Sequence, residues 1–257
     1  MRISLELLVI FFLILGRTAG VFLQAPILNS RSFPAFAKTA LAIWITFAIV
    51  FVTPINPQLP TTPFAFVLAL IFEIAVGFII GFICNIIFIA VQAAGEVADM
   101  QMGLSVATAL DPTFGAVISV IGRLSFFFAL IIFISANGHH LVLSALHQSF
   151  TALPVGKAAN FTSPQLGMQI IALGSSLWLT AIKLAAPIVL LVFISDFTFG
   201  IVSRVAPQVN VFMLGFQVKP SLGLFGYMLA LPFIAKYIVN LLKVMTEQLI
   251  IFTNTIK

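Results

Sequence analysis

Apolar residues fill most of this sequence in long stretches that charged residues seldom interrupt. Charged side chains are absent from residues 39–72, 74–95, 124–156 and 158–182. A helix needs about 20 mostly apolar residues to cross a bilayer, and it satisfies its own backbone hydrogen bonds there. We therefore predict an all-α, polytopic membrane-type chain with a single domain over residues 1–257. Its six apolar helical segments are expected at about 5–23, 39–53, 64–91, 117–137, 167–194 and 221–242.

Two of these segments have a second interpretation. The first could be a cleaved signal peptide, but Glu6 and Arg17 interrupt it and no clear small-x-small cleavage site follows, so we expect a retained helix. The second is short for a full crossing, and prolines recur at every third position from 54 to 63 behind it. That period is typical of polyproline II, which favours a stiff connector over a peptide-recognition ligand.

Composition restricts the class of protein further. Hydrophobic residues make up 61% of the chain and charged residues only 7%, whereas soluble domains carry roughly 25% charged residues. This balance excludes a soluble enzyme and a disordered chain. The single cysteine, Cys84, rules out an intrachain disulfide framework. The net charge of +5 comes from scattered basic residues, so the basic patch of a nucleic-acid site is missing.

Five charged residues fall inside the predicted apolar segments. They are Arg17, Glu73, Arg123, Lys183 and Lys236. A charge at bilayer depth costs several kcal/mol, so such residues usually face protein or water. Two interpretations stay open: buried ion pairs between helices of one bundle, or a water-filled path or multisubunit interior. Basic residues divide evenly between the two sides, which gives no positive-inside bias and favours a subunit held largely by partners.

A polar stripe is predicted along the middle of the chain. At about 100° per residue, eight residues fall in one sector of a helix: Glu73, Gly77, Gly81, Asn85, Gln92, Glu96, Asp99 and Gly103. A continuous helix over residues 73–103 would be about 45 Å long, so we expect a bend or break in it. The spacing of Gly77 and Gly81 predicts close contact with a neighbouring helix.

The stretch from Gln92 to Pro112 is too polar for lipid and too apolar for a solvated loop. Non-helical or half-inserted backbone at bilayer depth is tolerated only against protein or around a cavity. Met100 and Met102 add soft side chains that adapt to variable surfaces. Ordinary packing is the alternative for this stretch.

Motifs for catalysis and metal binding are missing. His139, His140 and His147 lack the glutamate of a zinc-protease motif, and we expect the two neighbouring histidines to point in different directions. Neither a nucleophile elbow nor a glycine-rich phosphate loop is present. We therefore expect no enzyme activity, no metal and no cofactor.

Three blocks of sequence, in order along the chain, resemble the FliR family of flagellar export-gate proteins. The first is Gln101-Met-Gly-Leu-Ser-Val-Ala-Thr-Ala-Leu-Asp-Pro112. The second is Asn137-Gly-His-His140 followed by Ser149-Phe-Thr-Ala-Leu-Pro-Val-Gly156. The third runs from Arg204 through Pro207-Gln-Val-Asn210 to Lys219, with Gln217 where many members have proline. The similarity covers essentially the whole chain.

The resemblance implies a subunit of the type III export gate in the flagellar basal body of the bacterial inner membrane. One such subunit, similar to a fusion of FliP and FliQ, is implied to join about five FliP and four FliQ, with FlhB on the cytoplasmic side, and to pass unfolded flagellar proteins. The loop at about 105–121 is implied to plug the closed pore. The alternatives are a virulence-system homologue, a small-solute transporter or a scaffold without a pore.

We place two sets of residues in this gate. The plug and its constriction are expected to include Met100, Gln101, Met102, Gly103, Leu104, Ser105, Asp111, Pro112 and Phe114. The interface with FliP or FliQ is expected to include Arg204, Pro207, Gln208, Asn210 and Gly215. Arg204 has an alternative role, because it could simply mark a membrane edge.

Overall fold

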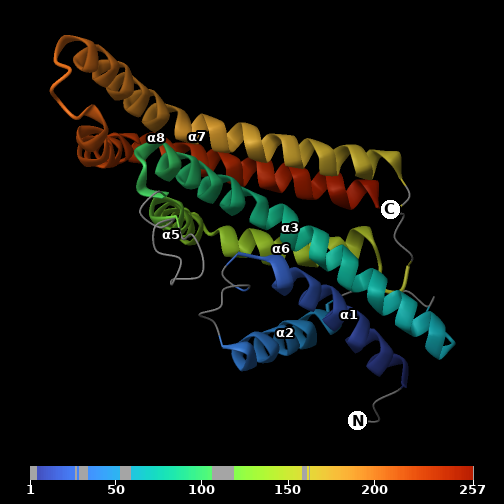
Figure 1. Ribbon diagram of the computed structural model, residues 1–257. Coiled ribbons are helices and arrows are strands. Elements are labelled where there is room, and N and C mark those ends of the chain that lie inside the picture. The colour runs from blue at the N-terminus through green and yellow to red at the C-terminus, as the bar shows by residue number, and fades with distance from the viewer. Residues whose placement is uncertain are drawn as a thin grey trace. The chain divides into compact units, whose positions relative to one another are not determined.

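The computed structural model describes residues 5–26, 28, 34–52, 59–105, 119–157, 161 and 163–256. Within these ranges the chain is all-α, as predicted, and contains seven helices and no strand (Figure 1). The helices are α1 (Leu5–Gln24), α2 (Ala35–Val50), α3 (Pro63–Met102), α5 (Val120–Ser135), α6 (Gly138–Ala152), α7 (Pro164–Val205) and α8 (Val211–Thr255).

The helices differ from the six predicted segments in length and number. Of the described helices, α1, α3, α7 and α8 are long and apolar enough to span a bilayer, and α5 with α6 forms a bent pair that qualifies as a fifth span. A bend or a break was expected within residues 73–103, and the structure excludes the break, because α3 is one continuous helix of 40 residues. The separate helix α6 was not predicted, and α2 is short as expected. Most of the proline-rich stretch lies outside the described residues.

The chain divides into two compact units, each made of several separate stretches. Unit 1 comprises residues 1–87, 133–173 and 241–257, and unit 2 comprises residues 88–132 and 174–240. Unit 1 therefore contains α1, α2, α6, the first part of α3, the start of α7 and the end of α8. Unit 2 contains the last part of α3, most of α5 and the middle of the α7–α8 pair.

Glycines bring α1 and α3 into backbone contact in unit 1. A Cβ atom added at Gly77 would lie 2.0 Å from the Arg17 carbonyl oxygen, and one at Gly20 would lie 2.3 Å from the Ile74 carbonyl oxygen. A Cβ at Gly81 would likewise meet the Val21 carbonyl oxygen at 2.6 Å. The two helices run in the same direction, because later residues of α1 meet later residues of α3. The predicted helix contact at Gly77 and Gly81 is confirmed, and α1 is its partner.

A sharp bend at Ala136–Asn137 separates α5 from α6. Asn137 has a φ of 57°, a left-handed conformation that asparagine tolerates better than most residues. The next residue is Gly138, where a Cβ atom would lie 2.3 Å from the Phe133 ring. The Asn-Gly pair therefore lets the chain change direction against the end of α5.

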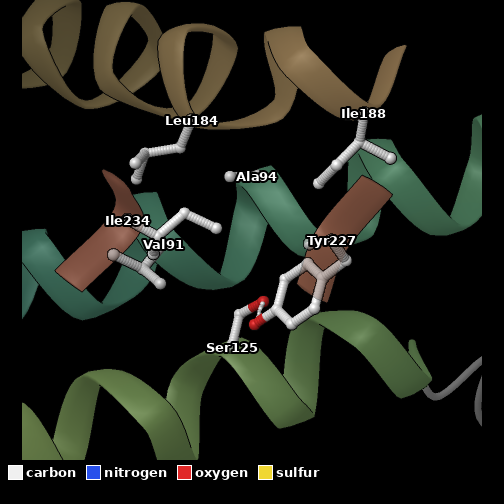
Figure 2. Close-up of a pocket in the computed structure, with 8 residues that line it drawn as sticks. Val91, Ala94, Ser125, Leu184, Ile188, Tyr227 and Ile234 are labelled. Carbon is white, nitrogen blue, oxygen red and sulfur yellow. Dashed lines mark hydrogen bonds between the residues drawn. The ribbon is translucent and has the colours of Figure 1, made fainter. Parts of the chain in front are cut away.

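Among the apolar side chains in the core of unit 2 lies a pair of hydroxyl groups. Figure 2 shows Val91 and Ala94 of α3 with Leu184 and Ile188 of α7 around a small cavity. In the same view, the Ser125 hydroxyl of α5 faces the Tyr227 hydroxyl of α8, at 3.0 Å. The cavity, at about 10 Å³, is at the lower limit of what one water molecule occupies.

Candidate functional site

Arg17 of α1 is fully buried and is the centre of a polar cluster in unit 1. Its Nε donates to Oε2 of Glu73 on α3 at 2.6 Å, and Nη1 donates to the Ser149 hydroxyl of α6 at 3.1 Å. Nη2 donates to the Leu153 carbonyl oxygen at 3.0 Å, and the guanidinium carbon lies 4.2 Å from the centre of the Phe150 ring. The Arg17 guanidinium therefore links α1, α3 and α6 within unit 1.

The structure separates the five charges within apolar segments into two groups. Arg17 and Glu73 form a buried ion pair between helices, as the first of the two open interpretations predicts. Arg123, Lys183 and Lys236 are exposed, and within the described residues none of them has an ion-pair partner. Arg123 instead lies over the Phe127 ring, 6.0 Å from its centre. These three charges therefore lie on the surface of the described part of the chain.

The predicted polar stripe on α3 has two different environments. Glu73, Gly77 and Gly81 are buried in unit 1, and Asn85 is half-buried. In unit 2, Gln92 and Glu96 are exposed and hydrogen-bonded to each other at 3.0 Å.

Asp99, by contrast, is buried and tied to the start of α5. The Ser119 hydroxyl donates to its Oδ2 at 2.5 Å, and the Ile121 backbone N–H lies 3.2 Å from both carboxylate oxygens. The Ser119 oxygen in turn accepts the Gly122 N–H at 2.8 Å. A carboxylate from one helix thus caps the N-terminus of another, where it also complements the positive end of the helix dipole.

The C-terminal end of α3 lines a cleft of about 510 Å³ in unit 2. Residues from the ends of α3 and α7 and the start of α8 line it: Met100, Gln101, Met102, Gly103, Asp196, Phe199, Gly200, Ser203, Val211, Phe212, Gly215, Phe216 and Lys219. The structure therefore brings four of the predicted constriction residues together with Gly215, which was predicted separately as an interface residue.

The two methionines at this end of α3 differ in exposure. Met100 is 69% exposed, whereas Met102 is fully buried and packs on Gly223 of α8. A Cβ atom at Gly223 would lie 2.5 Å from Cγ of Met102, so this glycine makes room for the methionine. Gly103 has a φ of +78°, which ends the helix in a conformation that glycine adopts without strain. Met102 therefore fixes the end of α3, and Met100 projects from it.

The remaining predicted plug residues divide between described and undescribed parts of the chain. Leu104 and Ser105 are half-buried just after Gly103. Asp111, Pro112 and Phe114 lie outside the described residues.

The predicted interface residues lie where α7 passes into α8. Arg204 is exposed in the last turn of α7, where its charge complements the negative end of the helix dipole. Pro207 and Gln208 are exposed in the connection. Asn210 caps α8, because its Oδ1 accepts the Met213 N–H at 3.2 Å. Gly215 is buried one turn further along.

Sequence reasoning missed the ion pair that lines the cleft. Lys219 Nζ of α8 lies 2.5 Å from Asp196 Oδ1 of α7. The two residues lie at nearly equal distances from the 206–210 connection, on opposite sides of it. Opposite charges at nearly equal distances before and after a turn between two helices predict an ion pair between those helices. The sequence could therefore have predicted this pair.

The neighbouring histidines do not point in different directions. The rings of His139 and His140 lie side by side at the start of α6, with centres 4.3 Å apart. Within the described part of the chain, no three His, Cys, Asp or Glu side chains lie together as a metal site requires.

The fold and these surfaces define a polytopic helical membrane protein whose long C-terminal helices leave apolar faces and charges exposed. Residues 8–245 match the family of bacterial export proteins, family 1, and the chain belongs to that family. It is 33% identical to the flagellar biosynthetic protein FliR of Escherichia coli, over 89% of this chain and 86% of the relative. Identity to FliR of Bacillus subtilis is 32%, over 85% of each chain. The Yop proteins translocation protein T of Yersinia pestis is 32% identical over 65% of this chain and 64% of its own length.

Proposed function

We propose that this chain is a subunit of the flagellar type III export gate in the bacterial inner membrane, within the basal body. It assembles with about five FliP and four FliQ subunits, contacts FlhB, and passes unfolded flagellar proteins without catalysing a reaction. The observation that carries the proposal is the family match over most of the chain, including relatives named FliR.

The exposed surface of α7 and α8 supports an assembled state. Only 33% of the apolar window of each helix is buried within the chain, against 61% for α3. Large side chains such as Phe193, Phe197 and Phe225 are more than half exposed. Lys183 and Lys236 lie on the same two helices and face away from the chain's own core. Lysines at such positions need protein or water around them, which partner subunits and a channel supply.

The mass of the gently purified complex tests this proposal. A heteromer of about ten subunits is expected when the chain is extracted together with its partners. A stable lone chain that transports a small solute would contradict it and favour a secondary transporter. Co-purification without any conductance would favour a scaffold.

We propose further that the constriction and plug of the closed gate lie at the C-terminal end of α3 and beyond it. Met100 and Leu104, with Phe114, provide a deformable apolar constriction, and Met102 supports it from behind through its contact with Gly223. An unfolded substrate has no fixed shape, so a soft apolar ring fits it better than a specific polar site. Gly103 gives the backbone at the end of α3 the freedom to move.

Deletion of residues 106–116 tests the plug. The resting gate is expected to leak ions once the segment is gone, and membrane conductance measures that leak. Unchanged conductance, in a variant that still co-purifies with its partners, would contradict the plug.

The connection between α7 and α8 is proposed as a contact with FliP or FliQ. Arg204, Pro207 and Gln208 are exposed there, while Asn210 holds the start of α8 in place. Replacing Arg204 by alanine is expected to reduce co-purification of partners. Full recovery of partners would favour the alternative that Arg204 marks a membrane edge.

A homologous gate in a virulence secretion system is the second candidate, because the Yersinia pestis relative has nearly the same identity over a shorter part of the chain. Complementation of a flagellar mutant strain separates the two. Restored motility favours the flagellar gate.

A further inference from the structure

Lys183 of α7 and Lys236 of α8 lie at the same level of unit 2. Leu184 and Ile234, which are one and two residues away from them in the sequence, line the same small cavity (Figure 2). At 1.5 Å per residue, each lysine is therefore within about 3 Å of the level of that cavity along its own helix axis.

Both lysines point away from that cavity. Successive side chains turn about 100° around a helix, so each lysine lies opposite the residues two positions before and after it. Those residues are buried on both helices. Among the described residues, neither lysine forms an ion pair or a hydrogen bond. Both ammonium groups therefore lie on the outer side of the α7–α8 pair.

The surface around the two lysines is apolar. Leu179 and Leu190, about one and two turns from Lys183, are 55% and 59% exposed, and Leu229, two turns from Lys236, is 65% exposed. Removing leucines from water is favourable, whereas burying an ammonium group is costly unless an opposite charge comes with it. A partner that covers this surface therefore has to bring carboxylates to the lysines.

Lipid phosphates are a poorer match for these two positions. Each lysine lies at least 19 residues from either end of its helix, which is about 28 Å along the axis. A lysine of a spanning helix reaches the lipid headgroups when it lies near a helix end. Contact with phosphates would require the bilayer surface to cross the middle of both helices, although uncharged residues continue on both sides of each lysine.

We infer that Lys183 and Lys236 are ion-pair positions in an interface with neighbouring subunits, an inference that rests on the proposed function. The partner is a membrane helix that carries an Asp or Glu side chain at the level of Leu184 and Ile234. Apolar residues around that carboxylate pack on the leucines around the lysines. Because a mismatched helix would leave the lysines buried without a counter-charge, the pairs select both the partner and its depth.

A carbodiimide that enters membranes tests for these ion pairs in the wild-type complex. The reagent joins a lysine amine to a carboxylate in direct contact through an amide bond, and mass spectrometry locates that bond. Amides are expected from Lys183 and Lys236 to Asp or Glu residues of another subunit. The Asp196–Lys219 pair within this chain is the internal control, because its amide shows that the reagent reached unit 2. The internal amide without an amide at either lysine would overturn the inference.

Variants of the two lysines measure what the pairs contribute to assembly. Lys183→Met and Lys236→Met leave a partner carboxylate unpaired in the interface, so the recovery of partner subunits should fall by roughly tenfold. Lys183→Arg and Lys236→Arg are the matched controls, which keep the charge and should keep the recovery. Methionine variants that assemble as well as wild type would overturn the inference. Loss of bound anionic lipid from those variants, with the partners retained, would assign the lysines to lipid phosphates instead.

The outcomes also separate this inference from the proposed function. A wild-type complex that contains its partners but forms no amide at Lys183 or Lys236 would overturn the ion pairs and leave the export-gate subunit standing. A wild-type chain that never co-purifies with FliP or FliQ would overturn both. The carbodiimide measurement uses the unaltered protein, so it decides the question even where a methionine variant fails to fold.

Discussion

Arg17 is a buried charged residue, and contacts within the protein replace the water that its guanidinium loses on burial. Each of its three nitrogens donates a hydrogen bond, and the Phe150 ring packs on its face. Glu73 is satisfied on its other side, because Oε1 accepts the Gly156 N–H at 3.3 Å. Geometry of this quality is what allows an ion pair to remain in an apolar interior. The pair therefore belongs to the architecture of unit 1.

Removing one partner of this pair should cost far more than removing both. Arg17→Ala leaves an unpaired buried carboxylate, and we expect a loss of about 3–5 kcal/mol in the free energy of unfolding. Arg17→Met combined with Glu73→Gln should recover most of that loss. Thermal unfolding in detergent measures both variants, and the exposed Arg123→Ala serves as the control, expected within about 0.5 kcal/mol. A double variant as unstable as Arg17→Ala would contradict the ion-pair explanation.

At the scale of elements, helix contacts were more predictable than helix lengths. The four-residue spacing of Gly77 and Gly81 predicted a contact, but spacing alone could not identify the α1 backbone at Arg17 and Val21 as the surface that they face. Helices α7 and α8 continue past the predicted apolar runs, and Asp196 and Lys219, which lie beyond those runs, pair with each other across the two helices. Charged residues interrupt the apolar pattern of the sequence, but α7 and α8 continue through them.

Helix α6 was not predicted, for a different reason. Its histidine, serine and glutamine residues lower its hydropathy below that of a span, although Val142, Leu146 and Phe150 keep a helical period. The buried face packs inside unit 1, where the Ser149 hydroxyl and Leu153 carbonyl meet Arg17. This helix is too short and too polar to be found as a span by itself, and it qualifies as part of one only together with α5.

The glycine contact between α1 and α3 gives a prediction at this scale. Gly77→Ala places a methyl group 2.0 Å from the Arg17 carbonyl oxygen, so the helices must separate. We expect a destabilisation of about 1–3 kcal/mol, as for other overpacked sites. The control is Gly174→Ala on α7, where nothing lies within 4 Å, and a gain of up to about 1 kcal/mol is expected from helix propensity. Thermal unfolding in detergent should rank the two variants in opposite directions, and equal effects would contradict the close contact.

For the whole molecule, the sequence indicated the candidate site only in parts. Four of the predicted constriction residues, Met100 to Gly103, and the separately predicted Gly215 are brought into one cleft by the tertiary structure. Phe216 and the Asp196–Lys219 pair complete its wall without having been predicted. Contacts across more than a hundred residues of sequence depend on how helices pack, which no single segment encodes.

The surroundings of α7 and α8 can be tested directly in the assembled complex. Phe197 is 67% exposed on α7, beside the Asp196 that lines the cleft. A photoreactive residue in its place should form adducts with FliP or FliQ, because a channel subunit with partners covers its apolar face with protein. The same residue at Ile80, which is fully buried, should give no adduct with another chain. Adducts with lipid alone at position 197 would show that this face of α7 borders the bilayer. The interface with FliP or FliQ would then lie on another face of α7 and α8.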